Sequence, residues 1–217
     1  MKDYLTKENL VDLIQKLADD VIAAKDQLTQ LDAILGDGDL GVTLTLGFTA
    51  VKESLAKPGP LTPQQVLRCA GEAFANKAAS TFGTLMATMF MRAGSAVREK
   101  EVIGPAEIAA MLGAAVEGVQ KRGKAKQGEK TVLDALIPAA GAAERAAEEG
   151  KTLAGCLDAA LAGAKQGAED TVNMRAEAGR SSWFKERSVG VKDPGAAALV
   201  VMLESVTRNL KRMTEGG

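Results

Sequence analysis

Residues 31–41 read Leu-Asp-Ala-Ile-Leu-Gly-Asp-Gly-Asp-Leu-Gly, and the rest of the chain is organised around this stretch. It carries three carboxylates, Asp32, Asp37 and Asp39, with glycines around the last two. Because glycine allows sharp backbone turns, a tight turn can direct the acids toward one point. Carboxylates that converge repel each other unless a cation lies between them, and all-oxygen ligands favour Mg²⁺ or Ca²⁺.

An EF-hand calcium loop does not fit this stretch. Counting Asp37 as its first position puts Phe48 where the bidentate Glu belongs and Gly41 where a side-chain ligand belongs. Magnesium that holds phosphate groups is the better interpretation. The local sequence leaves one alternative open, a helix-ending Asp/Gly turn with solvated acids, because such strings are common in turns.

Composition limits the class of protein. The 217 residues contain no Pro/Gly/Ser-rich linker, so we expect a single domain over residues 1–217. A net charge of −1 and 3% aromatic residues argue against a nucleic-acid partner, and no apolar run reaches membrane length. The chain has no histidine, which excludes His bases and His-ligated zinc. Its two isolated cysteines, Cys69 and Cys156, are expected to be buried free thiols in a cytoplasmic protein.

Apolar residues recur at helical spacing throughout, and no segment shows convincing period-two alternation. We therefore expect an all-α fold, a bundle of about eight antiparallel helices with short connections. The first helix is expected to follow Thr6 and to run to about Ala33. An interruption at residues 80–83 is expected to precede a fourth helix that begins at Thr84.

In such an arrangement the odd-numbered connections share one end of the molecule. They are the acidic turn, residues 80–83, the polar loop 123–130 and the irregular stretch 176–192. Helix N-termini also open at this end, and their free N–H groups favour phosphate oxygens. No Walker-type loop is present. With a bound cation, the basic residues in or beside the last two loops predict a polyphosphate site, although each charged loop taken alone fits a solvated surface. These residues are Lys121, Arg122, Lys124, Lys126, Lys130, Arg180, Lys185, Arg187 and Lys192.

Three segments together resemble a known family. They are residues 31–41, residues 122–138 (Arg-Gly-Lys-Ala-Lys-Gln-Gly-Glu-Lys-Thr-Val-Leu-Asp-Ala-Leu-Ile-Pro) and residues 179–196 (Gly-Arg-Ser-Ser-Trp-Phe-Lys-Glu-Arg-Ser-Val-Gly-Val-Lys-Asp-Pro-Gly-Ala). In this order and spacing they resemble the ADP-binding L subunit of bacterial dihydroxyacetone kinase, and the matching C-terminal domain of single-chain ATP-dependent dihydroxyacetone kinases. The resemblance covers nearly the whole chain.

The resemblance implies a closed barrel of eight antiparallel helices, with ADP held at one end through two Mg²⁺ ions. It implies that Asp32, Asp37 and Asp39 bind the magnesium. Matching positions imply a nucleotide site made of Leu40, Gly41, Val42, Thr43, Thr81, Phe82, Gly123, Val132, Arg180, Asp193, Pro194 and Gly195.

The function implied is that of a phosphotransferase subunit that presents ADP or ATP. In the family a partner K subunit holds dihydroxyacetone on its own histidine, which agrees with the missing histidine here. The implied partners are this K subunit and a phosphotransferase-type M subunit, and the implied assembly is a dimer in isolation or a heteromer with the K subunit. No nucleic acid and no membrane enter this reaction.

Two positions depart from the family pattern. Leu40 stands where His or Cys is frequent, and Phe82 where Ser is usual, so we expect the nucleotide to exchange more readily. Two further hypotheses stay open: an ATP-dependent kinase subunit for another short keto-sugar, and a non-catalytic module that senses nucleotide and docks a regulator. The aspartates fit all of these, and the neighbouring genes would discriminate among them.

Overall fold

The structure, a computed structural model, describes residues 3–57 and 62–215. In these residues the chain is helical apart from turns, irregular loops and one isolated β-bridge between Leu5 and Ile103. The α-helices are α1 Lys7–Ala23, α2 Lys25–Leu35, α3 Leu40–Leu55, α4 Pro63–Lys77, α5 Thr81–Ala96, α6 Pro105–Gly123, α7 Leu133–Glu148, α8 Leu153–Asp170 and α9 Pro194–Glu215. Three short 3₁₀ helices, η1 Thr171–Asn173, η2 Arg180–Trp183 and η3 Lys185–Ser188, lie between α8 and α9.

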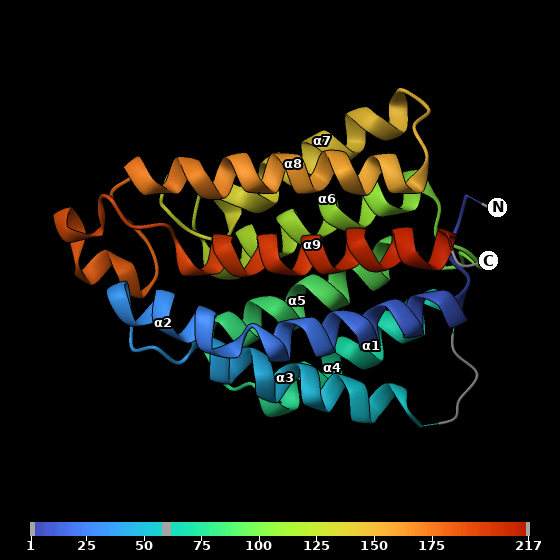
Figure 1. Ribbon diagram of the computed structural model, residues 1–217, viewed down its shortest axis with the longest axis horizontal. Coiled ribbons are helices and arrows are strands. Elements are labelled where there is room, and N and C mark those ends of the chain that lie inside the picture. Colours follow the sequence, from blue (N-terminus) through green and yellow to red (C-terminus); the bar gives the residue numbers. More distant parts are fainter. Residues whose placement is uncertain (1–2, 58–61, 216–217) are drawn as a thin grey trace.

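Eight of the helices form a closed ring. Each packs against the next in the order α1, α3, α4, α5, α6, α7, α8, α9, and α9 returns to α1. The short helix α2 lies against α3 and α9 at one end of this barrel (Figure 1). Successive helices of the ring run in opposite directions, so the loops after α2, α4, α6 and α8 gather at that same end. The expected all-α antiparallel barrel is confirmed.

Capping residues fix several helix starts. Thr6, Thr62, Ser80 and Thr152 each accept a hydrogen bond from the backbone N–H three residues further on, at 3.0 to 3.3 Å. This satisfies one of the N–H groups that a first helical turn leaves without a partner. The expected start after Thr6 is confirmed.

Two expected helix boundaries are wrong. The first helix does not run on to Ala33, because the backbone at Ala24 turns to ψ 4° and divides it into α1 and α2. No glycine or proline marks this break in the sequence. The fourth helix begins at Thr81 instead of Thr84, because Ser80 caps it. Residues 80–83 are thus the first turn of α5.

Aromatic and small residues shape the core together. The rings of Phe48 and Phe74 meet edge to face with centroids 5.3 Å apart, and Phe90 lies 6.2 Å from the Phe48 centroid. A Cβ at Gly47 would lie 2.3 Å from the Phe74 ring, so glycine lets α3 approach α4 closely. No helix among the described residues is long and apolar enough to span a bilayer.

The closest approach of α7 to α8 lies beside the loop end. Pro138 in α7 has no N–H to donate to the carbonyl of Asp134. Gly167 of α8 lies against this carbonyl, where a Cβ would stand only 2.0 Å from the oxygen. A glycine at this position is therefore required for the two helices to pack this closely.

Candidate functional site

The four loops at the α2 end enclose one cavity of about 320 Å³. Its lining comes from the turn between α2 and α3, the start of α5, the loop between α6 and α7, and the segment between α8 and α9. These are the odd-numbered connections of the expected up-and-down fold. The prediction that these connections share one end of the molecule is confirmed.

Three acids form one wall of this cavity. Asp32 belongs to the last turn of α2, while Asp37 and Asp39 lie in the turn that follows. One carboxylate oxygen from each lies within 4.8 Å of the others, which suits a hard divalent cation. Gly38 makes the turn possible with φ of +71°, in the left-handed region. Burial raises the pKa of Asp39, and the nearby charge of Asp32 raises it further.

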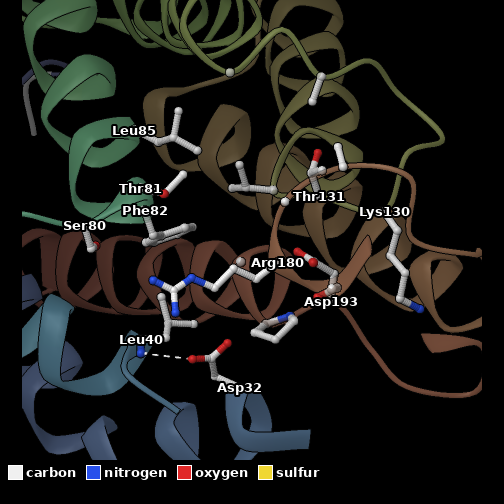
Figure 2. A pocket seen from close by; sticks show the side chains of 18 of the residues that line it. Asp32, Leu40, Ser80, Thr81, Phe82, Leu85, Lys130, Thr131, Arg180 and Asp193 are labelled. Carbon is white, nitrogen blue, oxygen red and sulfur yellow. Dashed lines mark hydrogen bonds between the residues drawn. The ribbon is translucent and has the colours of Figure 1, made fainter. Parts of the chain in front are cut away.

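One guanidinium faces these acids from the opposite loop. Arg180, at the start of η2, forms an ion pair with Asp37 and has a nitrogen 3.9 Å from an oxygen of Asp39. Its side chain is about half exposed, so the pairing is easily exchanged for another anion. Figure 2 shows Arg180 between Asp32 and Leu40 on one side and Phe82 on the other.

The remaining wall is apolar. It is lined by Phe82 and Leu85 of α5, Val119 of α6, and Val132 and Leu133 at the start of α7. In Figure 2 Leu85 and Phe82 lie on the far side of Arg180 from Asp32. The cavity therefore offers cation ligands at one end and an apolar surface at the other. A ligand with a phosphate chain and a flat, weakly polar ring system matches this division.

Most of the predicted nucleotide residues meet at the cavity, and three do not line it. Gly41 packs against the backbone of Lys25, Val42 is 43% exposed, and Thr43 is buried. The Thr43 hydroxyl donates to Ser80 Oγ at 3.2 Å, which ties α3 to the start of α5. Those that line the cavity are Leu40, Thr81, Phe82, Gly123, Val132, Arg180, Asp193, Pro194 and Gly195.

The expected contribution of basic residues from the last two loops to one site is wrong in its extent. Of the nine residues predicted, only Lys130 and Arg180 line the cavity in the described structure. Lys192 pairs with Glu169 instead, on the outer surface. The Lys130 ammonium is buried and donates to three backbone carbonyls, so it is not available to a phosphate.

Two buried acids, Asp134 and Asp193, have structural roles that the sequence did not reveal. Asp134 accepts from the N–H groups of Gly128 at 2.5 Å and Thr131 at 2.7 Å, which shapes the loop before α7. Asp193 accepts from the N–H of Ala196 at 2.7 Å and caps α9. Burial raises the pKa of Asp193 to about 7; the Asp134 charge acts in the same direction, and the hydrogen bond from Ala196 opposes both. An Asp followed by Pro is a recognisable signal for the start of a helix, but no local sequence pattern indicated that Asp193 is buried.

The DAK2 domain family model matches residues 34–208. The chain belongs to the DAK2 domain family. The ADP-binding subunit DhaL of the PEP-dependent dihydroxyacetone kinase of Escherichia coli (strain K12) is 30% identical over 200 residues, covering 92% of this chain and 95% of the relative. The L-erythrulose kinase of Pectobacterium atrosepticum is 31% identical over 201 residues, which are 90% of this chain and 34% of that protein.

A solved structure of the dihydroxyacetone kinase from C. freundii, in complex with AMP-PNP and Mg²⁺, superposes on this DAK2 chain with a TM-score of 0.75. The match covers 95% of this chain and 34% of the other, at 22% sequence identity. At that identity the likeness shows the fold. The acid wall, Arg180 and the apolar wall therefore sit on a DAK2 fold.

Proposed function

We propose that this chain is the nucleotide-binding component of a dihydroxyacetone-type kinase. It presents magnesium-bound ADP or ATP for phosphoryl transfer to a short ketose held on a partner subunit. The observation that carries the proposal is one cavity with three convergent carboxylates at one end and an apolar wall at the other. The ADP-binding subunit and the erythrulose kinase among its relatives support the same reaction class.

Asp32, Asp37 and Asp39 would hold the magnesium. Bound ions would screen the phosphate charge and draw the phosphate oxygens to the acid wall. Charge counting favours two ions. The three acids, Arg180 and an ADP of charge about −3 together leave a net charge of about −3 if one divalent ion is bound. With two bound ions the net charge of the site is about −1.

The chain's own groups have positioning roles. Arg180 is placed to contact phosphate oxygens as well as the acids, because its guanidinium has five donors. The first turn of α3 begins at Leu40, which lines the cavity, so the positive end of that helix lies beside the acid wall. Leu85 and Val132 would contact the base and exclude water. With no histidine in the chain, the base that accepts the ketose hydroxyl proton would belong to the partner.

A partner is expected to hold the ketose. This chain spans nearly the whole length of the E. coli ADP-binding subunit but about a third of the erythrulose kinase. A substrate-holding K subunit would then supply the ketose, and the donor would be free ATP or a phosphotransferase-type M subunit. Two free thiols, Cys69 and the buried Cys156, fit a reducing compartment such as the cytoplasm.

Calorimetry and a transfer assay test this proposal together. ADP is titrated into the protein with Mg²⁺ and with EDTA, and ATP-dependent phosphorylation of dihydroxyacetone is then measured with an added K subunit. We expect binding only with Mg²⁺, and transfer that Asp39→Asn abolishes. Asp158→Asn, which removes an exposed carboxylate on α8, is the matched control and keeps both activities. Nucleotide binding without transfer would favour the sensing module instead, and no binding with Mg²⁺ would refute the proposal.

A further inference from the structure

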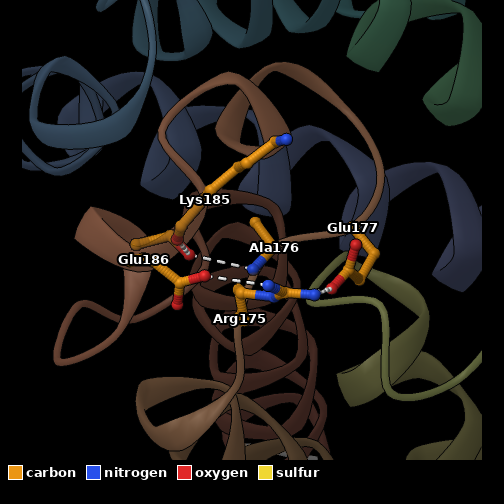
Figure 3. A network of polar contacts seen from close by, with 6 residues as sticks. Arg175, Ala176, Glu177, Lys185 and Glu186 are labelled. Carbon is orange, nitrogen blue, oxygen red and sulfur yellow. Dashed lines mark hydrogen bonds and ion pairs between the residues drawn. The ribbon is translucent and has the colours of Figure 1, made fainter.

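Residues 174–191 form a strap that lies over the cavity. The strap carries η2 and η3, and its residues Arg180 and Trp183 line the cavity. Contacts within the strap hold its shape. The Ser188 hydroxyl accepts from the N–H of Ala176 at 2.8 Å. Arg175 forms ion pairs with both Glu177 and Glu186 (Figure 3). These contacts give the strap its own shape, but they do not fix it to the barrel.

The two ends of the strap meet at one side chain, and a backbone hydrogen bond from the N–H of Gly190 to the carbonyl of Val172, at 2.7 Å, also joins them. Lys130 donates to the carbonyl of Thr171 in η1, just before the strap, at 2.6 Å, and to that of Met174, the first residue of the strap, at 3.1 Å. It donates to the carbonyl of Val191, at 2.6 Å, where the strap ends. An ammonium has three hydrogens, so all its donors are engaged by the backbone. Next to it, Glu129 accepts at its carbonyl from the N–H of Glu177 at 3.2 Å.

The environment of Lys130 is costly, and this distinguishes it from an ordinary surface lysine. Its side chain is 1% exposed, and burial lowers its pKa while the charge of Asp193 partly opposes that shift. Its backbone also has φ of +60°, a region that residues other than glycine rarely adopt. Strain of this kind persists where the surrounding structure requires the side chain at that place.

A phosphate ligand and a plain core residue are the competing assignments. The first fails because the three hydrogens already meet three carbonyls. The second does not account for the partners, because the carbonyls belong to both ends of a single loop that carries Arg180. A side chain that joins the ends of a loop controls where the middle of the loop lies.

We propose that Lys130 is a positioning residue for phosphoryl transfer, which joins the two ends of the strap and so places Arg180 opposite Asp37 and Asp39. The proposal rests on the proposed function for its kinetic effect. Its structural part, the fixing of the strap, stands independently and has a readout of its own.

Limited trypsin digestion of Lys130→Met tests the structural part. The strap contains Arg175, Arg180, Lys185 and Arg187, so a released strap is cut there while the helices stay resistant. The matched control is Lys192→Met, because that ammonium pairs with Glu169 at the surface and touches no strap carbonyl in the described contacts. We expect rapid strap cleavage in Lys130→Met, and the wild-type rate in the control. Equal rates in all three proteins would overturn the proposal.

A double-mutant cycle with Arg180→Met tests the kinetic part. Misplacing a contact group by about 1 Å lowers transfer by roughly 100-fold, so each single variant should lose on that order in kcat/KM. If Lys130 acts through Arg180, the double variant loses no more than Arg180→Met alone, within about twofold. Fully additive losses would overturn the proposal, because a general structural role does not depend on Arg180.

Two further readings keep the test decisive. Lys130→Gln retains two donors on a shorter side chain and is measured in parallel, with circular dichroism on every variant. Loss of helical content in both Lys130 variants would overturn the proposal, because the ammonium would then be holding the whole fold. A wild-type protein that binds no nucleotide would refute the proposed function, while the trypsin result would still decide the role of Lys130.

Discussion

The free energy of unfolding should fall as pH rises, because the carboxyl group of Asp193 loses its proton. In the folded protein burial raises its pKa from 3.8 to about 7, whereas in the unfolded chain it returns to the ordinary value. Folding therefore favours the protonated form. The associated stability is fully present below pH 4 and is lost as pH rises through about 7.

The size of this effect follows from the shift. One pKa unit corresponds to about 1.4 kcal/mol, so the whole shift is worth about 4 kcal/mol, and about 2.5 kcal/mol of it is lost between pH 5 and pH 8. Asp193→Asn keeps an oxygen that can accept the Ala196 N–H and cap α9, but it cannot ionise. The free energy of unfolding of the variant should therefore rise relative to that of the wild type by about 2.5 kcal/mol between pH 5 and pH 8.

Urea unfolding followed by circular dichroism at pH 5, 6, 7 and 8 measures the difference. Asp158→Asn, which removes an exposed acid, serves as the control and should keep the pH dependence of the wild type. A stability difference between wild type and Asp193→Asn that stays constant from pH 5 to pH 8 would refute the reasoning. In that case Asp193 would be ionised throughout, despite its burial.

Four further outcomes are expected. Mg²⁺ and ADP together should stabilise the chain by roughly 2.7 kcal/mol at 100 times Kd, whereas either alone should not; equal thermal shifts with and without EDTA would contradict this. Asp37→Asn and Asp39→Asn should each abolish transfer with unchanged circular dichroism, and gross unfolding would instead indicate a structural role. Phe82→Ser should slow ADP release roughly tenfold to a hundredfold in a chase with labelled nucleotide, because it restores one hydrogen bond to phosphate; an unchanged rate would count against that contact. Gly167→Ala should cost about 1–3 kcal/mol in urea unfolding because its Cβ meets a carbonyl at 2.0 Å, while Gly113→Ala, with nothing within 4 Å, should be neutral or stabilising.

The sequence predicted the end of the barrel that carries the site because that prediction rested on connectivity. Once the helices were counted as antiparallel neighbours, the odd-numbered loops had to meet. An error at one helix boundary did not disturb this: the break at Ala24 adds a helix, but α2 continues toward the same end. The acids at residues 32–39 were readable for a similar reason, since their spacing and glycines belong to one short turn.

Contacts between distant loops were beyond sequence reasoning. Lys130 reads as a loop cation, yet its partners lie 41 to 61 residues further along the chain. Asp193 reads as a helix cap, which it is, but its raised pKa depends on burial and on the charge of Asp134, which no local pattern around Asp193 encodes. Charge in a sequence predicts exposure by default, and only the packed structure shows which charged groups break that rule.

The exceptions to local rules are concentrated at one end of the molecule. Of the four non-glycine residues with positive φ in the described chain, Lys124, Lys130 and Lys185 lie in the two loops that border the cavity. The buried ionisable side chains of Lys130 and Asp193 lie there too, and each shifts the pKa of the other in the direction that favours its charged form. Such features cost stability, and a barrel closed by eight packed helices does not depend on them. Their shared effect is to fix the strap and the start of α9 around the cavity. We therefore attribute their cost in stability to the need for a precisely placed Arg180.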